Sequence, residues 1–153
     1  MSTTVKAEDL PSLVGQELEP SSWLEVTQDR VNQFADATND HQFIHVDIEQ
    51  AAKTPFGGTV SHGFLTLSLV PFLMAEKTWK VDGTVMGINY GSDKVRFLAP
   101  VPVGSRIRAR QVLLEVTQKT RAHWLTKTAV TIEIEHQEKP AMIAEILMII
   151  VVK

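Results

Sequence analysis

The chain has 153 residues, the length of one domain, and 44% of them are hydrophobic, so folding can bury a proper core. Cysteine is absent, which excludes disulfides, thiol nucleophiles and cysteine-ligated zinc and favours a cytoplasmic location. The net charge of -3 and the scattered basic residues favour a small-molecule partner over nucleic acid or a membrane surface.

No stretch of the sequence is typical of a targeting or membrane-spanning segment. The start, MSTTVKAEDLPSLVG, has no apolar core and includes Glu8 and Asp9, unlike a secretory or transit peptide. The longest apolar stretches, GFLTLSLVPFLMA and AEILMIIVV, are shorter than the roughly 20 residues of a transmembrane helix. Without repeats or linkers, the sequence predicts one soluble domain over residues 1–153.

The first part of the chain predicts a short strand and two helices. SSWLEVT alternates like a strand, and Thr27 caps an apolar periodicity that predicts a helix ending near Asn39. DIEQAAKTP predicts a second, short helix between an Asp47 cap and Pro55. The polar segment between these helices shows neither the helical nor the strand periodicity of apolar residues, so it is expected to be a loop.

From Ser61 onward the sequence predicts a buried helix. SHGFLTLSLVPFLMAEK is apolar on almost every side, and a helix of this kind must be surrounded by protein. Ser61 is a candidate cap for its first turn, and Pro71 removes one main-chain hydrogen bond and favours a kink.

Four strand-like runs follow the helix: TVMGINYGSDKVRFLA, SRIRARQVLLEVTQ, RAHWLTKTAVTIEIEHQ and AMIAEILMIIVVK. In the second run the inward set moves from Ile107 and Ala109 to Val112, Leu114 and Val116, which predicts a β-bulge. The last run is apolar on both faces, which favours a central or interfacial position.

Long antiparallel strands after one buried helix predict an α+β fold in which a curved sheet wraps that helix. Such a sheet has exposed edges, and pairing two copies edge to edge would cover them.

The segment ATNDHQFIHVD concentrates titratable side chains. A loop can bring Asp40 and His45 onto one water molecule, where the pair can remove a proton from the water and return it. A purely structural role, with Asp40 as a cap and His45 packed, is the alternative, and His41 is expected to be a solvated neighbour. A metal bound by Asp40, His41, His45 and Asp47 matches no known ligand spacing, so we expect none.

The segment GGTVSHGFL is the second candidate. Gly63 lies in the first helical turn, where main-chain N–H groups lack acceptors and can bind an oxyanion, and no Cβ obstructs a ligand carbonyl. Gly63 could instead serve tight packing alone, and His62 is expected to be structural rather than catalytic.

Together, FADATNDHQFIHVD, SHGFLTLSL and INYGSDKVRFLAPVPVGS resemble the MaoC-like hotdog-fold family of (R)-specific enoyl-CoA hydratases and 3-hydroxyacyl-thioester dehydratases. The resemblance is closest to its single-hotdog branch, which includes nodulation protein N, and is strongest from about Trp23 to Pro102. It implies that the catalytic pair is Asp40 and His45, that the Gly63 amide binds the thioester, and that the site lies at a homodimer interface.

The resemblance also implies a central helix beginning at about Ser61, which places Ser61 beside the substrate. The family's commoner D-x-N-P-x-H is DHQFIH here, with Gln42 for Asn and Phe43 for Pro. Gln42 can still donate and accept hydrogen bonds, so we include it among the substrate-binding residues. No metal or redox cofactor is implied.

The function predicted is reversible hydration of a trans-2-enoyl thioester, carried on coenzyme A or acyl carrier protein, to the (R)-3-hydroxyacyl thioester. A hotdog acyl-CoA thioesterase and a non-catalytic acyl-thioester binding module are the alternatives. Leu67, Val70 and Met74 are candidates for the floor of an acyl tunnel. The arginines at 106, 108 and 110, with Lys94 and Arg96, fit either coenzyme A phosphates or a solvated strand face.

Overall fold

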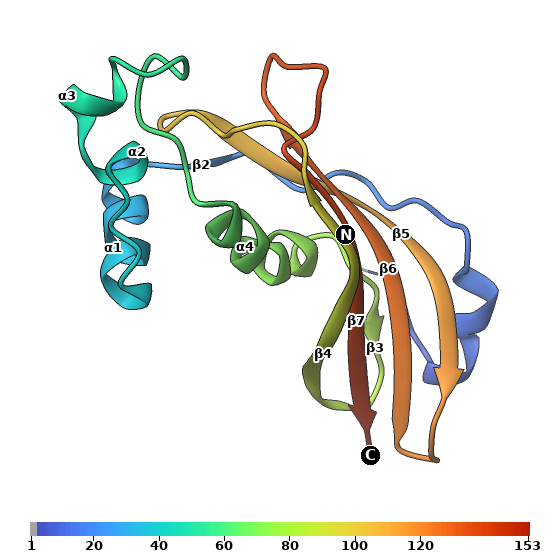
Figure 1. The fold of residues 1–153 in the computed structure, drawn as a ribbon. Helices are drawn as coiled ribbons and strands as arrows, with labels where there is room; N and C mark the ends of the chain where they lie inside the picture. Colours follow the sequence, from blue (N-terminus) through green and yellow to red (C-terminus); the bar gives the residue numbers. More distant parts are fainter. Residues whose placement is uncertain (1–2) are drawn as a thin grey trace.

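The computed structural model describes residues 3–153 and is built on one long, curved antiparallel sheet with a helix on its concave side (Figure 1). The sheet has the strand order β2-β5-β6-β7-β4, and every neighbouring pair is antiparallel. Its strands are β2 (Leu24–Glu25), β4 (Thr84–Phe97), β5 (Arg106–Gln118), β6 (His123–Ile134) and β7 (Met142–Val152). The predicted α+β fold is therefore confirmed.

The order of the strands confirms the position predicted for the last apolar run. β7 lies between β6 and β4, so it is a central strand whose two edges are both paired. At the far end of the molecule, β1 (Thr4–Val5) and β3 (Lys80–Val81) form a small parallel pair, and the 3-10 helix η1 (Ala7–Leu13) lies between them in the chain. In the part of the chain that the structure describes, no helix is long and apolar enough to cross a membrane.

The bulge in β5 exists, but it lies further along the strand than predicted. Gln111 and Leu113 continue the buried set begun by Ile107 and Ala109, and the register shifts only between Leu113 and Glu115. The prediction that Val112 points inward was therefore wrong. The reason is that Gln111, a polar residue, takes an inward position by donating a hydrogen bond from Nε2 to the Met74 carbonyl at 3.1 Å.

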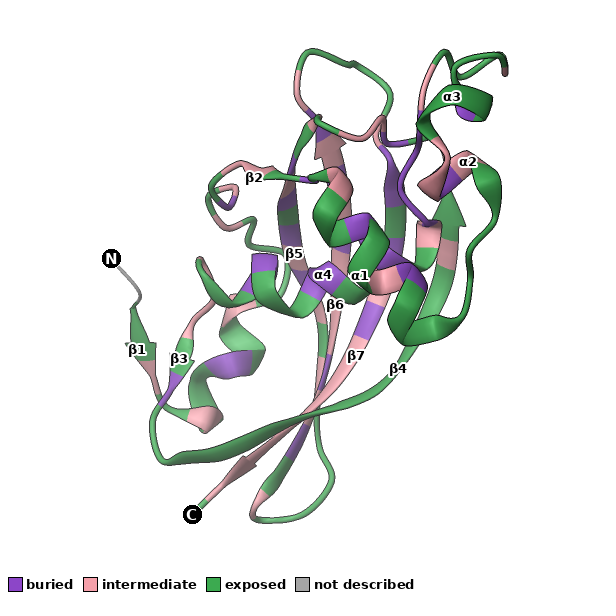
Figure 2. Cartoon of the chain, turned by 90° about the vertical axis from the view of Figure 1, so that its left-hand side faces the viewer, coloured by how far each residue is buried: buried purple, intermediate pink, exposed green. Residues whose placement is uncertain are grey.

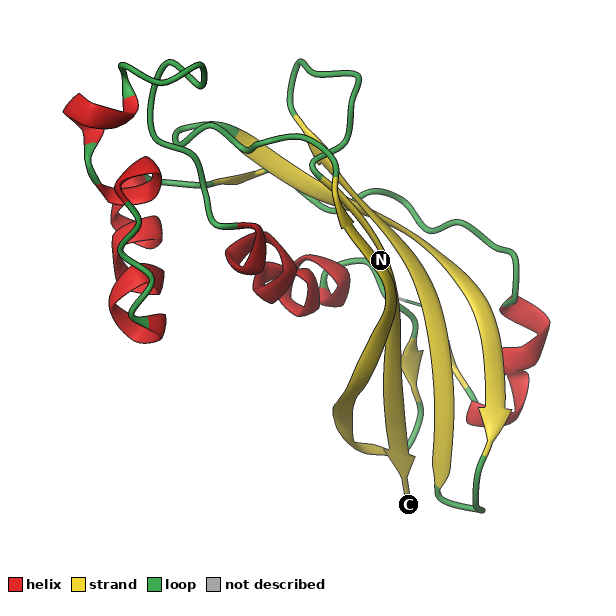
Figure 3. Ribbon diagram, viewed as in Figure 1, coloured by secondary structure: helices red, strands yellow, loops and turns green. Residues whose placement is uncertain are grey.

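The predicted helices of the first half are present, with one addition (Figure 3). α1 (Gln28–Thr38) is capped by the Thr27 side chain, and α3 (Ile48–Ala51) is capped by the Asp47 carboxylate. α3 ends well before Pro55, so the helix is shorter than predicted. The segment expected to be a loop contains the helix α2 (Phe43–Val46), whose single turn is too short to show a period in the sequence.

The buried helix, α4 (Gly63–Ala75), lies between the sheet and α1 (Figure 1). One side of it packs into the core through Leu65, Leu69, Val70, Leu73 and Met74. The expectation that α4 is surrounded was wrong for the single chain. Two phenylalanines on its other side, at positions 64 and 72, are 68% and 63% exposed. In Figure 2 the colour for exposed residues covers part of α4 and most of β4.

Ser61 does not cap α4. The residue in the cap position is His62, which makes no side-chain capping bond. The Ser61 hydroxyl instead donates to the His62 carbonyl at 3.2 Å, because Ser61 lies one residue too early to reach the amides of the first turn.

Candidate active site

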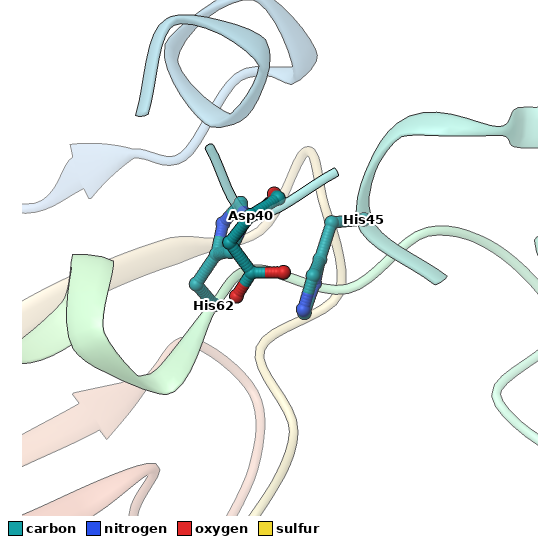
Figure 4. Close-up of side chains that lie close together, drawn as sticks. All are labelled: Asp40, His45 and His62. Atoms are coloured by element: carbon teal, nitrogen blue, oxygen red, sulfur yellow. The ribbon is translucent and has the colours of Figure 1, made fainter. Parts of the chain in front are cut away.

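Three segments bring Asp40, His45 and His62 together (Figure 4). Asp40 follows the left-handed residue Asn39, at φ 57°, which ends α1 and turns the chain. His45 belongs to the single turn of α2, and His62 precedes α4. Each of the three side chains offers an atom within 4.8 Å of the others, so the predicted pair is assembled and a second histidine joins it.

The His45 imidazole is buried and held in one orientation. Its Nδ1 lies 2.6 Å from the Val60 carbonyl oxygen, which can only accept, so Nδ1 carries the proton and Nε2 of the neutral ring keeps its lone pair. The His45 main chain is fixed as well, because Gln28 donates to its carbonyl at 2.8 Å and Thr59 donates to Gln28 at 2.6 Å. Nε2 is therefore the ring nitrogen that can accept a proton.

Burial also sets the charge of His45. Loss of solvation lowers the pKa of His45 from its ordinary value, and the neighbouring His62 lowers it further. The Val60 carbonyl and the Asp40 carboxylate act in the opposite direction but do not outweigh burial. At neutral pH the ring is therefore uncharged and can accept a proton.

The Asp40 side chain is exposed, and its Oδ2 accepts no hydrogen bond from residues 3–153. Its Oδ1 accepts a long hydrogen bond of 3.4 Å from the main-chain N–H of Gln42, which shapes the turn into α2. The Gln42 side chain is itself exposed and makes no hydrogen bond to the described residues. The structure thus places the Gln42 main chain against Asp40.

Gly63 begins α4, as its predicted role requires. Within residues 3–153, the amides of Gly63 and Phe64 donate to no protein acceptor, so two N–H groups are available at this helix start. A Cβ at position 63 would lie 3.0 Å from the Phe97 ring, so the glycine also permits close packing. The Ser61 N–H is engaged with the Val101 carbonyl at 2.8 Å, and Ser61 is buried.

The four residues considered as metal ligands from the sequence, Asp40, His41, His45 and Asp47, do not come together at one point. His41 is exposed and pairs with Asp36 at 2.8 Å, which confirms it as a solvated neighbour, while the Asp47 carboxylate caps α3. The two histidines beside Asp40 stack with ring centroids 3.9 Å apart and planes 25° apart. An ion in the plane of one ring would therefore lie well outside the plane of the other, which is unfavourable for chelation by both rings.

The arginines of β5 are engaged with carboxylates on the strand face. Arg106 pairs with Glu135, Arg108 with Glu133 at 2.6 Å, and Arg110 with Glu17. These ion pairs favour the interpretation as a solvated strand face over phosphate binding. Lys94 likewise pairs with Glu145 at 3.3 Å.

A groove of about 480 Å³ runs between α4 and β4. It is lined by Leu67, Ser68, Val70, Pro71, Asn89, Gly91, Ser92 and Ile146. Of the three residues predicted to floor an acyl tunnel, Leu67 and Val70 line this groove, whereas Met74 lines a separate cavity of about 60 Å³ at the other end of α4.

A curved antiparallel sheet wrapped around one central helix defines the hotdog class of proteins. Within that class, the MaoC like domain matches residues 9–136, and the chain belongs to this family. The likeness extends to solved structures: the monoamine oxidase regulatory protein of Archaeoglobus fulgidus superposes with a TM-score of 0.78 at 23% identity, over 100% of this chain and 99% of the other.

Two relatives are similar over almost their whole length. The chain is 49% identical to nodulation protein N of Rhizobium leguminosarum bv. viciae, over 93% of this chain and 89% of the relative. It is 47% identical to 3-hydroxyacyl-thioester dehydratase Z of Mycobacterium tuberculosis, over 95% of each chain. The resemblance to the nodulation protein N branch is thus confirmed.

Proposed function

We propose that the chain is a hydro-lyase that reversibly adds water to trans-2-enoyl thioesters and yields (R)-3-hydroxyacyl thioesters. The observation that carries this proposal is the meeting of a free carboxylate, Asp40, with the buried and uncharged imidazole of His45 beside the first turn of α4. The similarity to a 3-hydroxyacyl-thioester dehydratase over nearly the whole of both chains supports the same activity.

In this mechanism the amide of Gly63 donates to the thioester carbonyl and stabilises negative charge that develops on its oxygen. Asp40 and His45 hold one water molecule between them. As the water oxygen bonds to C3, the pair takes its proton and returns a proton to C2, so that one water is consumed and the thioester bond stays intact. Asp40 and His45 act on the same water molecule, so the proton is shared between them.

The acyl chain would extend from Gly63 along the groove between α4 and β4, over Leu67 and Val70. The reaction moves a proton and a hydroxyl group and no net electrons, so we propose that it needs neither a metal nor a redox cofactor. Coenzyme A or acyl carrier protein serves only as the carrier of the substrate.

The test of the proposal is to mix the protein with crotonyl-CoA and follow two readouts. Hydration destroys the conjugated enoyl absorbance and releases no thiol, and chiral analysis should find the (R)-3-hydroxyacyl product. Release of thiol from crotonyl-CoA and from saturated thioesters would instead establish a thioesterase. Neither change, across short and long acyl chains on both carriers, would indicate binding without catalysis.

The rate of hydration should depend on pH through His45. The neutral ring is the form that accepts a proton, so kcat/KM falls as the pH drops through the pKa of His45. Because burial lowers that pKa from 6.5, activity should persist to more acidic pH than an ordinary histidine would allow. Initial rates between about pH 5 and 8 test this. An acidic limb centred at or above 6.5 would contradict it.

We infer that two copies form a homodimer through β4 and the open side of α4. Large apolar side chains are exposed there, including Phe64 and Phe72 on the helix and Met86, Ile88 and Tyr90 on the edge strand. A contiguous surface of this kind marks an association site, and an edge strand invites pairing with another chain.

Light scattering at micromolar concentration should therefore give twice the mass of one chain. Replacing Phe72 with Glu should shift the protein toward monomer, whereas replacing Val14 with Glu, at an exposed position after η1, should not. A wild-type protein that is monomeric and active would contradict the dimer.

A further inference from the structure

His62 connects the parts of the candidate site, although its position in the sequence suggests only a structural role. It is 2% exposed and lies immediately before Gly63. One face of its ring stacks on His45, with centroids 3.9 Å apart, and the Phe34 ring of α1 packs against it at 4.9 Å. A single side chain thus contacts the imidazole and adjoins the helix start.

The hydrogen bonds of His62 link it to the third part of the site. Its Nε2 lies 3.0 Å from the main-chain oxygen of Asp40, which can only accept, so Nε2 carries the proton and donates. Its Nδ1 is buried and has no partner within residues 3–153. A buried polar atom without a partner costs free energy, and a phenyl ring would fill the same space without that cost. The imidazole is therefore poorly explained by packing alone.

We propose that His62 is a positioning residue for the Asp40–His45 pair. Its hydrogen bond holds the main chain at Asp40, and its ring holds the plane of the His45 imidazole, so both reacting groups keep their orientation relative to Gly63. This inference rests on the proposed hydration. Displacing a reacting group by about 1 Å can cost 10²-fold in rate, so we expect turnover to depend on His62 even though it touches no substrate.

The stacking also has an electrostatic consequence. The electrostatic effect of the His62 ring lowers the pKa of His45, the same direction in which burial acts. Within residues 3–153, the titratable groups that act on His45 are Asp40 and His62. From α1, the uncharged Gln28 side chain donates to the His45 carbonyl, and Phe34 packs against His62. Removing the second imidazole should therefore raise the pKa of His45.

Two variants separate the contributions of the ring and the hydrogen bond. His62→Phe keeps a flat ring against His45 but loses the donor to Asp40, whereas His62→Gln keeps an N–H donor and loses the ring. His41→Gln is the matched control, because His41 is exposed and outside the cluster. The measurements are kcat and KM for crotonyl-CoA hydration, and an NMR titration of the His45 ring, whose signals are assigned by their loss in His45→Gln.

We expect His62→Phe to lower kcat by about 10–100-fold with little change in KM, and His62→Gln to recover part of that loss. In both variants the His45 titration and the acidic limb of kcat/KM should move to higher pH, while His41→Gln changes neither. A folded His62→Phe protein with wild-type kcat and an unmoved His45 titration would overturn the inference. If His62→Phe does not fold, His62→Gln decides: an unmoved His45 titration overturns the inference and a raised one supports it.

The NMR titration distinguishes this inference from the proposed function. If the wild-type protein does not hydrate crotonyl-CoA, the proposed function fails, yet the titration still reports whether His62 controls the His45 ring. If hydration occurs but His62→Phe behaves as wild type in both measurements, only the role of His62 fails.

Discussion

Replacing Asp40 with Asn, or His45 with Gln, is expected to lower the turnover of enoyl-thioester hydration by about 10²–10⁴-fold, the usual contribution of a positioned acid or base. Asn cannot take a proton from water, and Gln has no group that titrates near neutral pH. Because the Asp40 carboxylate is exposed and, among the described residues, accepts one long hydrogen bond of 3.4 Å, its loss should leave the fold intact. Circular dichroism checks that both variants are folded.

The same substitutions outside the pair provide the controls. Asp36→Asn and His41→Gln change the same chemical groups on an exposed pair near the site, at 2.8 Å from each other, and should retain wild-type turnover. Wild-type turnover in a folded Asp40→Asn or His45→Gln protein would return that residue to a structural role.

Replacing Gly63 with Ala should lower kcat by up to about 10²–10³-fold, the effect of losing one donor to a developing oxyanion, because the alanine N–H is kept but moved or screened by the new Cβ. The added Cβ would lie 3.0–3.1 Å from three atoms of the Phe97 ring, too close unless the helix start or the ring moves. Alanine is the best helix former, so helix propensity alone predicts no loss of stability. Steady-state kinetics at saturating crotonyl-CoA measures the effect.

Two further variants identify the cause of that loss. Gly58→Ala is the control, because its Cβ would meet nothing within 4 Å. The double variant Gly63→Ala/Phe97→Ala is compared with the single variant Phe97→Ala. If the two have the same kcat, the loss in Gly63→Ala comes from displacement of the helix start by the Phe97 ring. If the double variant still has a lower kcat than Phe97→Ala, the loss comes from the Cβ blocking the thioester. A fully active Gly63→Ala protein would remove Gly63 from the mechanism.

The long elements of this fold are predictable from sequence because their patterns extend over many residues. The four long strands lie where alternating or wholly apolar runs predict them, and the caps at Thr27 and Asp47 are formed. Short or context-dependent features are not predictable in this way. The single turn of α2 is shorter than one helical repeat, and Gln111 faces inward only because the carbonyl of Met74 is there to receive its hydrogen bond.

In the candidate site, too, the features that depend on nearby residues were predictable and those that depend on distant contacts were not. Asp40 and His45 lie five positions apart in sequence, so one local turn suffices to bring them together, and the sequence indicated the pair. The stacking of His62 on His45 and its bond to Asp40 depend on how distant segments pack. The only local signal was the adjacency of a histidine to Gly63. Likewise, the apolar pattern of α4 shows that it must be covered but not that Phe64 and Phe72 stay open in one chain.

The place of β7 in the sheet has a consequence for biosynthesis. β4 is translated before β5, β6 and β7, yet within the described chain it pairs with β7 alone. At roughly 5–20 residues per second, β4 spends seconds outside the ribosome before its partner strand exists. During that interval the main-chain groups of β4 lack their partner strand, and its apolar residues, such as Ile88 and Tyr90, are open to contact with other chains. Completion of the sheet must therefore follow translation of β7, and the nascent chain is most prone to aggregate just before that point.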